Sequence, residues 1–416
     1  MKKKNIPVWV RKIGIYLAVL GPGLITASAD NDAPGIATYS MAGSTYGYQF
    51  LLIILIVTIG EVVIQEIAAR MGVVTGKGTA DLIRERFGVK VTAFAMVILL
   101  VANLGTTVAQ IAGIAAAAEL FGISRYIAAP LAAILVSVSV LKGSYKVIEK
   151  ILLALSLSAL SYVITVFMIN PPWIEVLRAA VVPRFEFNSG FLLAMLATVG
   201  TTITPWGIFY MQASVADKGV DVKNYQFTKA DVVFGAAWGN LISAFIIIAT
   251  ATTLFTVGIS VESAEQAAMV LSPLVGDAAK ILFSAGLLGA SLLAMSVLPL
   301  STTYAFCEAF GFERGLNRTS KEAPVFYGLY GAMITLSVVI VLIPGIPLFP
   351  LMWLSQSLNA LLLPIILILL LKLSNNVQLM GKWKNKRFQN VLAYGLTILI
   401  SLLSLALLVT SIIEIT

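Results

Sequence analysis

The sequence predicts an all-α integral membrane protein with eleven membrane spans, arranged as two inverted five-helix repeats plus one extra helix. The chain of 416 residues is 59% hydrophobic and only 12% charged. Apolar stretches of about 20 residues recur from end to end, and each is long enough to cross roughly 30 Å of hydrocarbon. Two of these stretches are interrupted by glycine and proline. The polar gaps are too short for a separate soluble domain, so we expect one transmembrane domain over 1–416.

The spans are placed by the apolar stretches alone, with polar or charged residues marking their ends. The first repeat is expected over 13–169, the second over 188–372, and the additional helix over 389–413. The first stretch is too long for a signal peptide's core and lacks a small-residue cleavage pattern. The expected spans are 13–45, 49–72, 89–121, 126–141, 147–169, 188–216, 229–257, 277–310, 323–344, 348–372 and 389–413.

Lysine and arginine lie on alternate sides of these spans. With a cytoplasmic N-terminus, all but four of the 28 basic residues fall in cytoplasmic segments or span ends, the exceptions being Arg125, Arg178, Arg184 and Lys280. We therefore expect a multi-pass protein of the cell membrane with a cytoplasmic N-terminus and an external C-terminus. The net charge of +8 follows from this topology. Its expected partner is anionic lipid of the inner leaflet, and not nucleic acid.

The first interrupted span contains GPGLITASADNDAPGIATYS, residues 21–40. Asp32 is followed at once by Pro34 and Gly35, which interrupt a helix near the middle of the bilayer. Backbone groups freed there must face protein, water or a ligand, and a carboxylate at this depth is costly without a partner. Asp32 is therefore a candidate ligand for a cation. Asp30 and Asn31 are expected either to line a solvated vestibule or to cap a half-helix.

The second interrupted span contains ATVGTTITPWGIFYMQAS, residues 197–214, in which Gly200, Pro205 and Gly207 accompany three threonines. It is span 6, which comes five spans after span 1. Because five is odd, a second five-span unit would cross the membrane in the opposite orientation. A single break is often no more than a kink, but paired breaks in inverted halves indicate the binding site of a transporter.

Around these breaks the chain resembles the Nramp family of divalent metal transporters. Residues 21–38 resemble that family's first span, and IQEIAARMGVVTGKGTADLIRERFG (64–88) resembles its second span and the following cytoplasmic loop. STTYAFCEAFGF (301–312) and LSQSLNALLLPIILILLLKLSNNVQLMG (354–381) are similar to its eighth and tenth spans. The resemblance covers nearly the whole chain and implies a LeuT-type fold with helices 1 and 6 broken.

The resemblance also implies a metal site. An aspartate and an asparagine in the first break and a methionine in the second bind metal in the family. Asp32 matches the aspartate, but Gly35 stands at the asparagine position and Thr204 at the methionine position. A backbone carbonyl that the family uses falls on Thr201, and a glutamine of its tenth span matches Gln356. Gly35 can contribute only backbone or space.

These departures change the metal that we expect. Replacing a thioether by Thr204 leaves oxygen ligands only, which favour Mg²⁺, Ca²⁺ or Mn²⁺ over softer ions. Mg²⁺ sheds water reluctantly and is usually held through one or two carboxylates. The pattern thus resembles the Nramp-related magnesium transporters, and we expect Mg²⁺, with Mn²⁺ also accepted, as a largely hydrated ion. Trp206 is expected to line or gate the cavity. Asn359 either faces the same cavity or forms a helix–helix hydrogen bond.

Proton coupling is not expected. The family's third-span Asp and Glu correspond to Thr107 and Gln110, and its sixth-span histidines to Trp206 and Met211. The chain has no histidine, so no imidazole titrates near neutral pH. A negative interior supplies about 2.3 kcal/mol per charge per 100 mV, which is sufficient to drive uptake of a dication.

Two residues and two other functions remain as alternatives. Glu61 or Glu66 in span 2 could relay protons, although Glu66 is well placed to pair with Arg70 four residues later. A proton-coupled Mn²⁺ symporter of the Nramp type and a sodium-coupled amino-acid carrier are the competing functions. An enzyme is not expected, because without histidine neither a zinc His-Glu-x-x-His motif nor a Ser-His pair is possible. We expect a monomer without a cofactor, with the metal as substrate.

Overall fold

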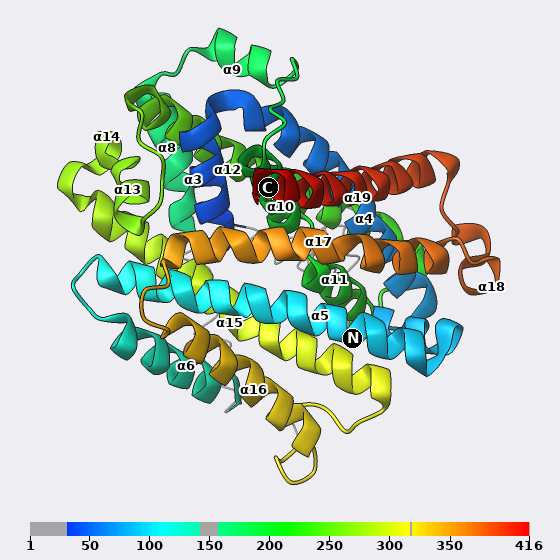
Figure 1. Ribbon diagram of the computed structural model, residues 1–416. Coiled ribbons are helices and arrows are strands. Elements are labelled where there is room, and N and C mark those ends of the chain that lie inside the picture. Colours follow the sequence, from blue (N-terminus) through cyan, green and yellow to red (C-terminus); the bar gives the residue numbers. More distant parts are fainter. Residues whose placement is uncertain (1–30, 142–156, 317, 416) are drawn as a thin grey trace, which may run out of the picture.

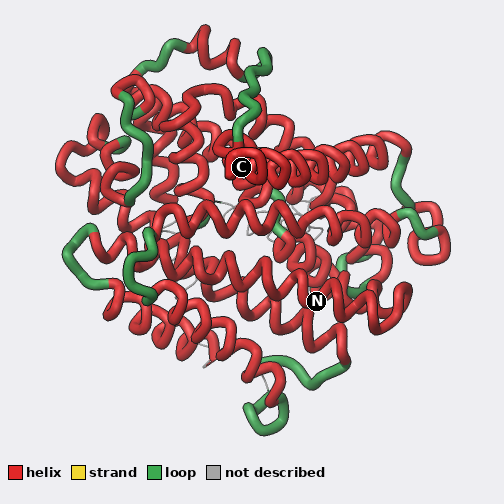
Figure 2. Tube along the Cα trace, viewed as in Figure 1, coloured by secondary structure: helices red, strands yellow, loops and turns green. Residues whose placement is uncertain are grey.

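The computed structural model describes residues 31–141, 157–316 and 318–415, and every regular element in these ranges is helical (Figures 1 and 2). Short helices α9 (Trp173–Ala179), α13 (Ala264–Met269), α14 (Ser272–Val275) and α18 (Val377–Met380) lie between longer ones. The longer helices are α3 (Ala33–Tyr46), α4 (Phe50–Thr75), α5 (Thr79–Glu119), α6 (Arg125–Leu141), α8 (Leu160–Ile169), α10 (Ser189–Thr202), α11 (Pro205–Asp217), α12 (Tyr225–Thr253), α15 (Ala279–Phe310), α16 (Pro324–Val341), α17 (Leu348–Ser374) and α19 (Arg387–Ile415).

Each of the eleven expected spans overlaps one of the longer helices, except span 6, which is divided between α10 and α11. Eight stretches in the described residues are long and apolar enough to cross a membrane, and one of them, Ala33–Thr75, contains both α3 and α4. The shorter apolar helices α6 and α8 correspond to the remaining two spans. The first halves of span 1 (13–30) and of span 5 (147–156) lie outside the described residues.

Two features differ from the expected pattern. Helix α5 begins at Thr79 and not near residue 89, and it bends at Gly88, whose φ of 76° is accessible to glycine at little cost. The charged residues before Gly88 conceal this first segment in an apolar profile. The short helices α9, α13 and α14 were also not expected, because elements of four to seven residues carry no apolar periodicity.

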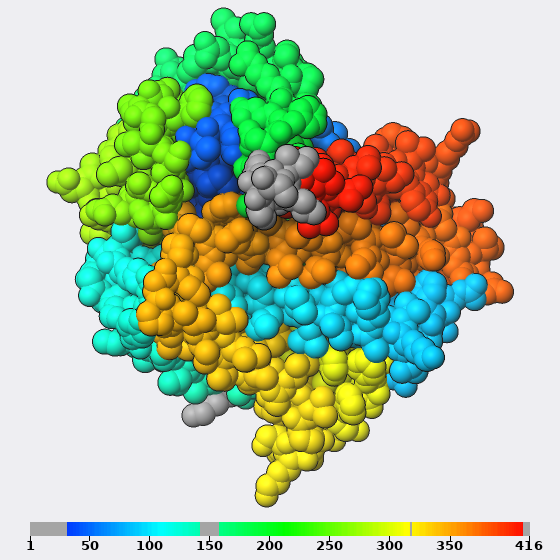
Figure 3. All heavy atoms as spheres, viewed as in Figure 1, coloured from blue at the N-terminus to red at the C-terminus, as the bar shows by residue number. Residues whose placement is uncertain are grey.

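Helix α5 is the centre of one side of the bundle. It packs against α15, α17 and α16, and these four helices run side by side in Figure 1. Helix α3 contacts α10, α12 and α17, while α12 also packs on α4. The segments that carry the two sequence breaks therefore lie between α5 and α17 on one side and α4 and α12 on the other. In the space-filling view α17 and α5 form adjoining bands across the visible face (Figure 3).

Glycines allow the helices around the breaks to approach closely. A Cβ on Gly200 of α10 would lie 1.9 Å from the Gln356 carbonyl oxygen and 2.8 Å from the Ala360 amide nitrogen of α17. A Cβ on Gly113 of α5 would lie 2.3 Å from the Ala33 Cβ at the start of α3. Because small residues permit such backbone contacts between membrane helices, both breaks are held against neighbouring helices.

We expect Gly200→Ala to destabilise the protein, because a backbone carbonyl cannot move aside as a flexible side chain can. The loss should be about 1–3 kcal/mol, typical of overpacking. Gly331→Ala on α16 is the matched control, since a Cβ there meets nothing within 4 Å. Thermal unfolding of both purified variants measures the difference, and equal midpoints would contradict the close crossing.

Candidate functional site

The first break lies at the start of α3. Asp32 has an extended backbone (φ −72°, ψ −177°) and precedes the first helical residue, Ala33. Its carboxylate oxygen Oδ1 accepts a hydrogen bond of 2.9 Å from the Gly35 amide, which is the usual geometry of an aspartate N-cap. Pro34 occupies the first turn, where its missing N–H is not needed. Asp32 is only 5% exposed, so its charge depends on the groups around it.

The second break is confirmed within span 6. Helix α10 ends at Thr202, and Ile203 (φ −112°, ψ 85°) and Thr204 (φ −87°, ψ 139°) are not helical. Helix α11 then begins at Pro205. The Thr204 hydroxyl oxygen accepts a hydrogen bond of 3.2 Å from the Gly207 amide. Both breaks thus share one construction, with a capping oxygen, a proline in the first turn, and a glycine three residues after the cap.

The second break also leaves a carbonyl without its helical partner. The residue four positions after Thr201 is Pro205, which has no amide hydrogen, so the helical bond to the Thr201 carbonyl cannot form. This end of α10 carries the negative partial charge of a helix C-terminus, which favours a cation. A hydrogen bond of 2.9 Å between Tyr39 Oη and Thr202 Oγ1 joins α3 to this end of α10.

Gln110 of α5 is the residue that contacts Asp32 directly. Its Nε2 donates a hydrogen bond to Asp32 Oδ2, and its side chain is buried. From the sequence, Gln110 is only the replacement of an acidic residue, and its contact with Asp32 is not predicted. A signal was present, because Asn103, Thr106, Thr107 and Gln110 recur at helical spacing and form one polar stripe along an apolar span.

Gln356 lies beside the second break, because α17 crosses α10 at Gly200. Its Nε2 donates to Ser355 Oγ (2.9 Å), and its Oε1 accepts from Asn359 Nδ2 (2.9 Å). Asn359 Nδ2 also donates to Thr106 Oγ1 of α5 at 2.9 Å. The helix–helix bond that was one of two alternatives for Asn359 is therefore present, and it connects Gln356 to the polar stripe of α5.

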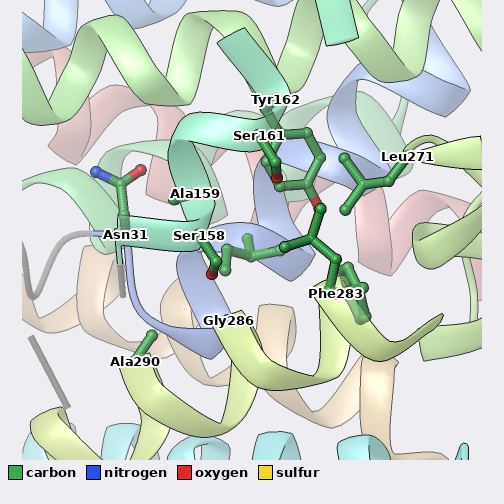
Figure 4. A pocket seen from close by; sticks show the side chains of 11 residues that line it. Asn31, Ser158, Ala159, Ser161, Tyr162, Leu271, Phe283, Gly286 and Ala290 are labelled. Atoms are coloured by element: carbon green, nitrogen blue, oxygen red, sulfur yellow. The ribbon is translucent and has the colours of Figure 1, made fainter. Parts of the chain in front are cut away.

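Asn31 faces helix α12 and a small cavity. Its Nδ2 donates to the Gly239 carbonyl (3.0 Å), and its Oδ1 accepts from Ser243 Oγ (3.2 Å). In Figure 4 the cavity lies between Asn31, the segment that leads into α8, and one face of α15. Its other residues include Ser158, Ser161, Tyr162, Phe283, Gly286 and Ala290. Asn31 thus lines a small cavity, and its place in a solvated vestibule stays a prediction, while Asp30 lies outside the described residues.

Trp206 is packed against protein. It is almost fully buried and contacts Leu298 of α15, and its ring centroid lies 5.9 Å from that of Tyr210. Its indole nitrogen is buried without a hydrogen-bond partner among the described residues. As a donor this nitrogen repels a cation, so Trp206 is suited to close a wall and not to bind metal.

Glu66 is held by several partners near one end of α4. It pairs with Arg70, whose Nε lies 3.5 Å from its Oε1, as the spacing of four residues predicted. Gln389 Nε2 donates to Glu66 Oε2 at 2.6 Å, and the Tyr225 hydroxyl donates to Oε1. Because α4, α12 and α19 all contribute, these contacts tie three helices together.

Glu61, five residues before Glu66 on α4, accepts a hydrogen bond from Asn240 Nδ2 of α12. Among the described residues no group of three or more His, Cys, Asp or Glu side chains could hold a metal ion. Within the described ranges, a cation at the breaks would therefore meet one carboxylate, that of Asp32, together with neutral oxygens.

The solved structures that this chain resembles establish its fold. The chain superposes on a manganese transporter from Eremococcus coleocola with a TM-score of 0.77 at 22% identity, covering 96% of this chain and 88% of that one. It also superposes on MhsT in complex with L-phenylalanine, with a TM-score of 0.60 at 14% identity and coverage of 93% and 98%. At these identities the likeness establishes the fold alone, which is the LeuT type expected from the sequence.

Sequence comparison then gives the family. Residues 23–410 match the model of the Nramp (Natural resistance-associated macrophage protein-like) family, so the chain belongs to that family of membrane transporters. The divalent metal cation transporter MntH of Erwinia tasmaniensis is 31% identical over 67% of this chain and 69% of its own length. MntH of Bacillus subtilis is 26% identical over 94% of this chain and 92% of its own.

We expect Asp32→Asn and Asp32→Ala to differ in stability, while both weaken metal binding. Asparagine is as good an N-cap as aspartate, whereas alanine loses the cap, at a cost of about 1 kcal/mol. Both variants lose the charge and should bind Mn²⁺ at least ten-fold more weakly. Thermal unfolding and isothermal titration calorimetry separate the two effects. Unchanged Mn²⁺ affinity in Asp32→Asn would show that the metal binds elsewhere.

Proposed function

We propose that this protein carries divalent metal cations across the cell membrane by alternating access, with the ion bound between the two breaks. The observation that supports this most strongly is a buried carboxylate, Asp32, joined through α3 to the open end of α10. Curated relatives of the family are divalent metal cation transporters, which agrees with this function. The ligands we propose are Asp32, the Thr201 carbonyl, Thr204 and Gln356, with Gly35 giving space.

The choice of ion is the finer part of the proposal. The superposed protein from Eremococcus coleocola is a manganese transporter, which supports Mn²⁺ more directly than the Mg²⁺ expected from the sequence, and the MntH relatives are divalent metal cation transporters. We therefore place Mn²⁺ among the substrates and add Mg²⁺ because the ligands are oxygens. One sulfur lies nearby, since Met352 Sδ would be 3.5 Å from a Cβ on Gly113, next to Ala33. Its contribution can be tested by substitution.

We further propose that transport is not coupled to protons. Thr107 donates its hydroxyl to the Asn103 carbonyl of its own helix (2.7 Å), and Gln110 carries a neutral amide. Glu66 is occupied by its ion pair and hydrogen bonds. The alternative is a proton-coupled Mn²⁺ symporter of the Nramp type, which the relatives favour. An amino-acid carrier is disfavoured, because the Asp32 carboxylate would repel the carboxylate of a zwitterion.

Flux into liposomes that enclose a pH indicator distinguishes these functions. We expect Mn²⁺ to enter, excess external Mg²⁺ to compete with it, and the interior not to acidify. Acidification that accompanies Mn²⁺ entry, together with no competition by Mg²⁺, would establish the symporter instead. Sodium-dependent uptake of an amino acid without any metal flux would establish the carrier.

Thr204→Met should shift preference toward soft ions, because it places a thioether at the second break. The Cd²⁺ to Mg²⁺ ratio of initial rates should rise at least ten-fold. Thr204→Ser keeps the capping oxygen and should leave the ratio unchanged. Met352→Leu removes the Met352 sulfur and should also leave the Cd²⁺ to Mg²⁺ ratio unchanged. A fall in Cd²⁺ transport by Met352→Leu would instead make that sulfur a ligand.

We also propose a monomer in contact with lipid, with its N-terminus in the cytoplasm and its C-terminus outside. Cys307 is the single cysteine and is buried, so introduced cysteines report topology. Arg178→Cys, on an exposed site expected outside, should react with an impermeant maleimide in intact cells. Lys384→Cys, exposed on the expected cytoplasmic side, should react only after lysis. The reverse result would invert the proposed orientation.

A further inference from the structure

We propose that Gln110 is a further ligand of the transported cation and acts through its side-chain oxygen, Oε1. This inference rests on the proposed function, because it concerns the same ion site. Gln110 lies on α5, 78 residues from Asp32 in the chain, yet its amide nitrogen donates to Asp32 Oδ2. Its side chain is 0% exposed, so the amide is enclosed by protein on all sides.

The orientation of the Gln110 amide follows from its partner. An ionised carboxylate only accepts hydrogen bonds, so the amide must present its nitrogen to Asp32. The oxygen on the same amide then points away from Asp32. That oxygen is buried and has no hydrogen-bond donor among the described residues. Leaving a buried acceptor without a donor is costly, and a divalent cation or one of its waters would satisfy it.

The surrounding helices hold this oxygen beside the first break. Gly113 lies one turn after Gln110, and it is the residue against which Ala33 packs closely. On the other side of the same crossing, Ser291 Oγ of α15 would lie 2.7 Å from a Cβ on Gly113. The Ser291 hydroxyl is likewise buried without a partner in the described part of the chain. Two unsatisfied oxygens thus accompany Asp32 where α3, α5 and α15 meet.

The neighbouring polar residue on α5 does not share this role. The Thr107 hydroxyl donates to the Asn103 carbonyl one turn earlier at 2.7 Å, so its hydrogen-bonding requirement is met within its own helix. Asn103 also carries a buried amide oxygen without a partner in the described part of the chain, but its nitrogen donates to Thr302 Oγ1 of α15. Gln110 is therefore distinguished from the rest of the polar stripe because its amide is fixed on Asp32 itself. A neutral amide oxygen is a ligand typical of hard cations such as Mg²⁺, Ca²⁺ and Mn²⁺.

Variants of Gln110 test the proposal by equilibrium binding. Gln110→Leu removes the oxygen and should weaken Mn²⁺ binding about ten-fold or more, the range observed when groups that support a metal site are lost. Gln110→Met is similar in length but offers sulfur, and it should raise the Cd²⁺ to Mg²⁺ affinity ratio at least ten-fold. Thr107→Val is the matched control on the same helix and should change neither quantity. Isothermal titration calorimetry of purified protein with each metal alone gives these values.

The change in metal preference separates a ligand from a residue that only positions Asp32. If Gln110→Leu weakens all metals but Gln110→Met leaves their order unchanged, Gln110 acts through Asp32 and the proposal fails. It also fails if both variants bind Mn²⁺ within two-fold of the unmodified protein. Should Gln110→Leu not fold, Gln110→Met and Gln110→Glu carry the test, and the added charge in Gln110→Glu should tighten Mn²⁺ binding. If the unmodified protein binds no divalent cation, the proposed function itself is wrong.

Discussion

The structure depends on how one negative charge is accommodated inside an apolar bundle. A carboxylate at the centre of a membrane helix costs about 3 kcal/mol even on the most lenient scale. Asp32 offsets part of this cost through the Gly35 amide and the Gln110 amide, which occupy one oxygen each. Both donors are neutral, so the charge itself is not balanced by any residue that contacts Asp32 in the described contacts. In the function that we propose, the transported cation supplies the missing charge, so the site and the fold depend on each other.

The second break provides neutral oxygens, whereas the first break provides a charge. Proline at position 205 removes the amide that would have bonded to the Thr201 carbonyl, and α17 comes so close at Gly200 that Gln356 must lie next to this opening. Tyr39 connects the first break's helix to the second through its hydrogen bond with Thr202. A movement of α3 relative to α10 would therefore alter both halves of the site together, as alternating access requires.

Much of this arrangement could be predicted from the sequence. The spans were predictable because lipid demands long apolar helices. The breaks were predictable because proline stands there together with glycine and polar residues. Proline alone is not sufficient, since Pro130, Pro299 and Pro364 lie inside continuous helices. The contact of Gln110 with Asp32 was not, since it depends on how α5 packs against α3, and the sequence of either segment says nothing of the other. The packing of Trp206 against Leu298 and Tyr210 was not predictable for the same reason, and its role in lining or gating the cavity stays a prediction. The helices, their breaks and the chemistry of each side chain were thus predictable from the sequence. Contacts between side chains on different helices became known only from the structure.

The charge at the site bears on the question of coupling. At the site that we propose, a dication next to the carboxylate of Asp32 would leave one positive charge to be stabilised by neutral oxygens, retained water and the end of α10. An acidic residue at position 110 would remove that excess charge, but it would also be protonated when no metal was present, because two buried carboxylates so close together repel each other. Metal entry would then release a proton. An amide at position 110 avoids this exchange, because it does not titrate and already donates to Asp32. Glutamine in place of an acidic residue at position 110 therefore weakens the electrostatic attraction for the ion. It also removes a group whose protonation would change when the ion binds, and with it a chemical reason for coupling to protons.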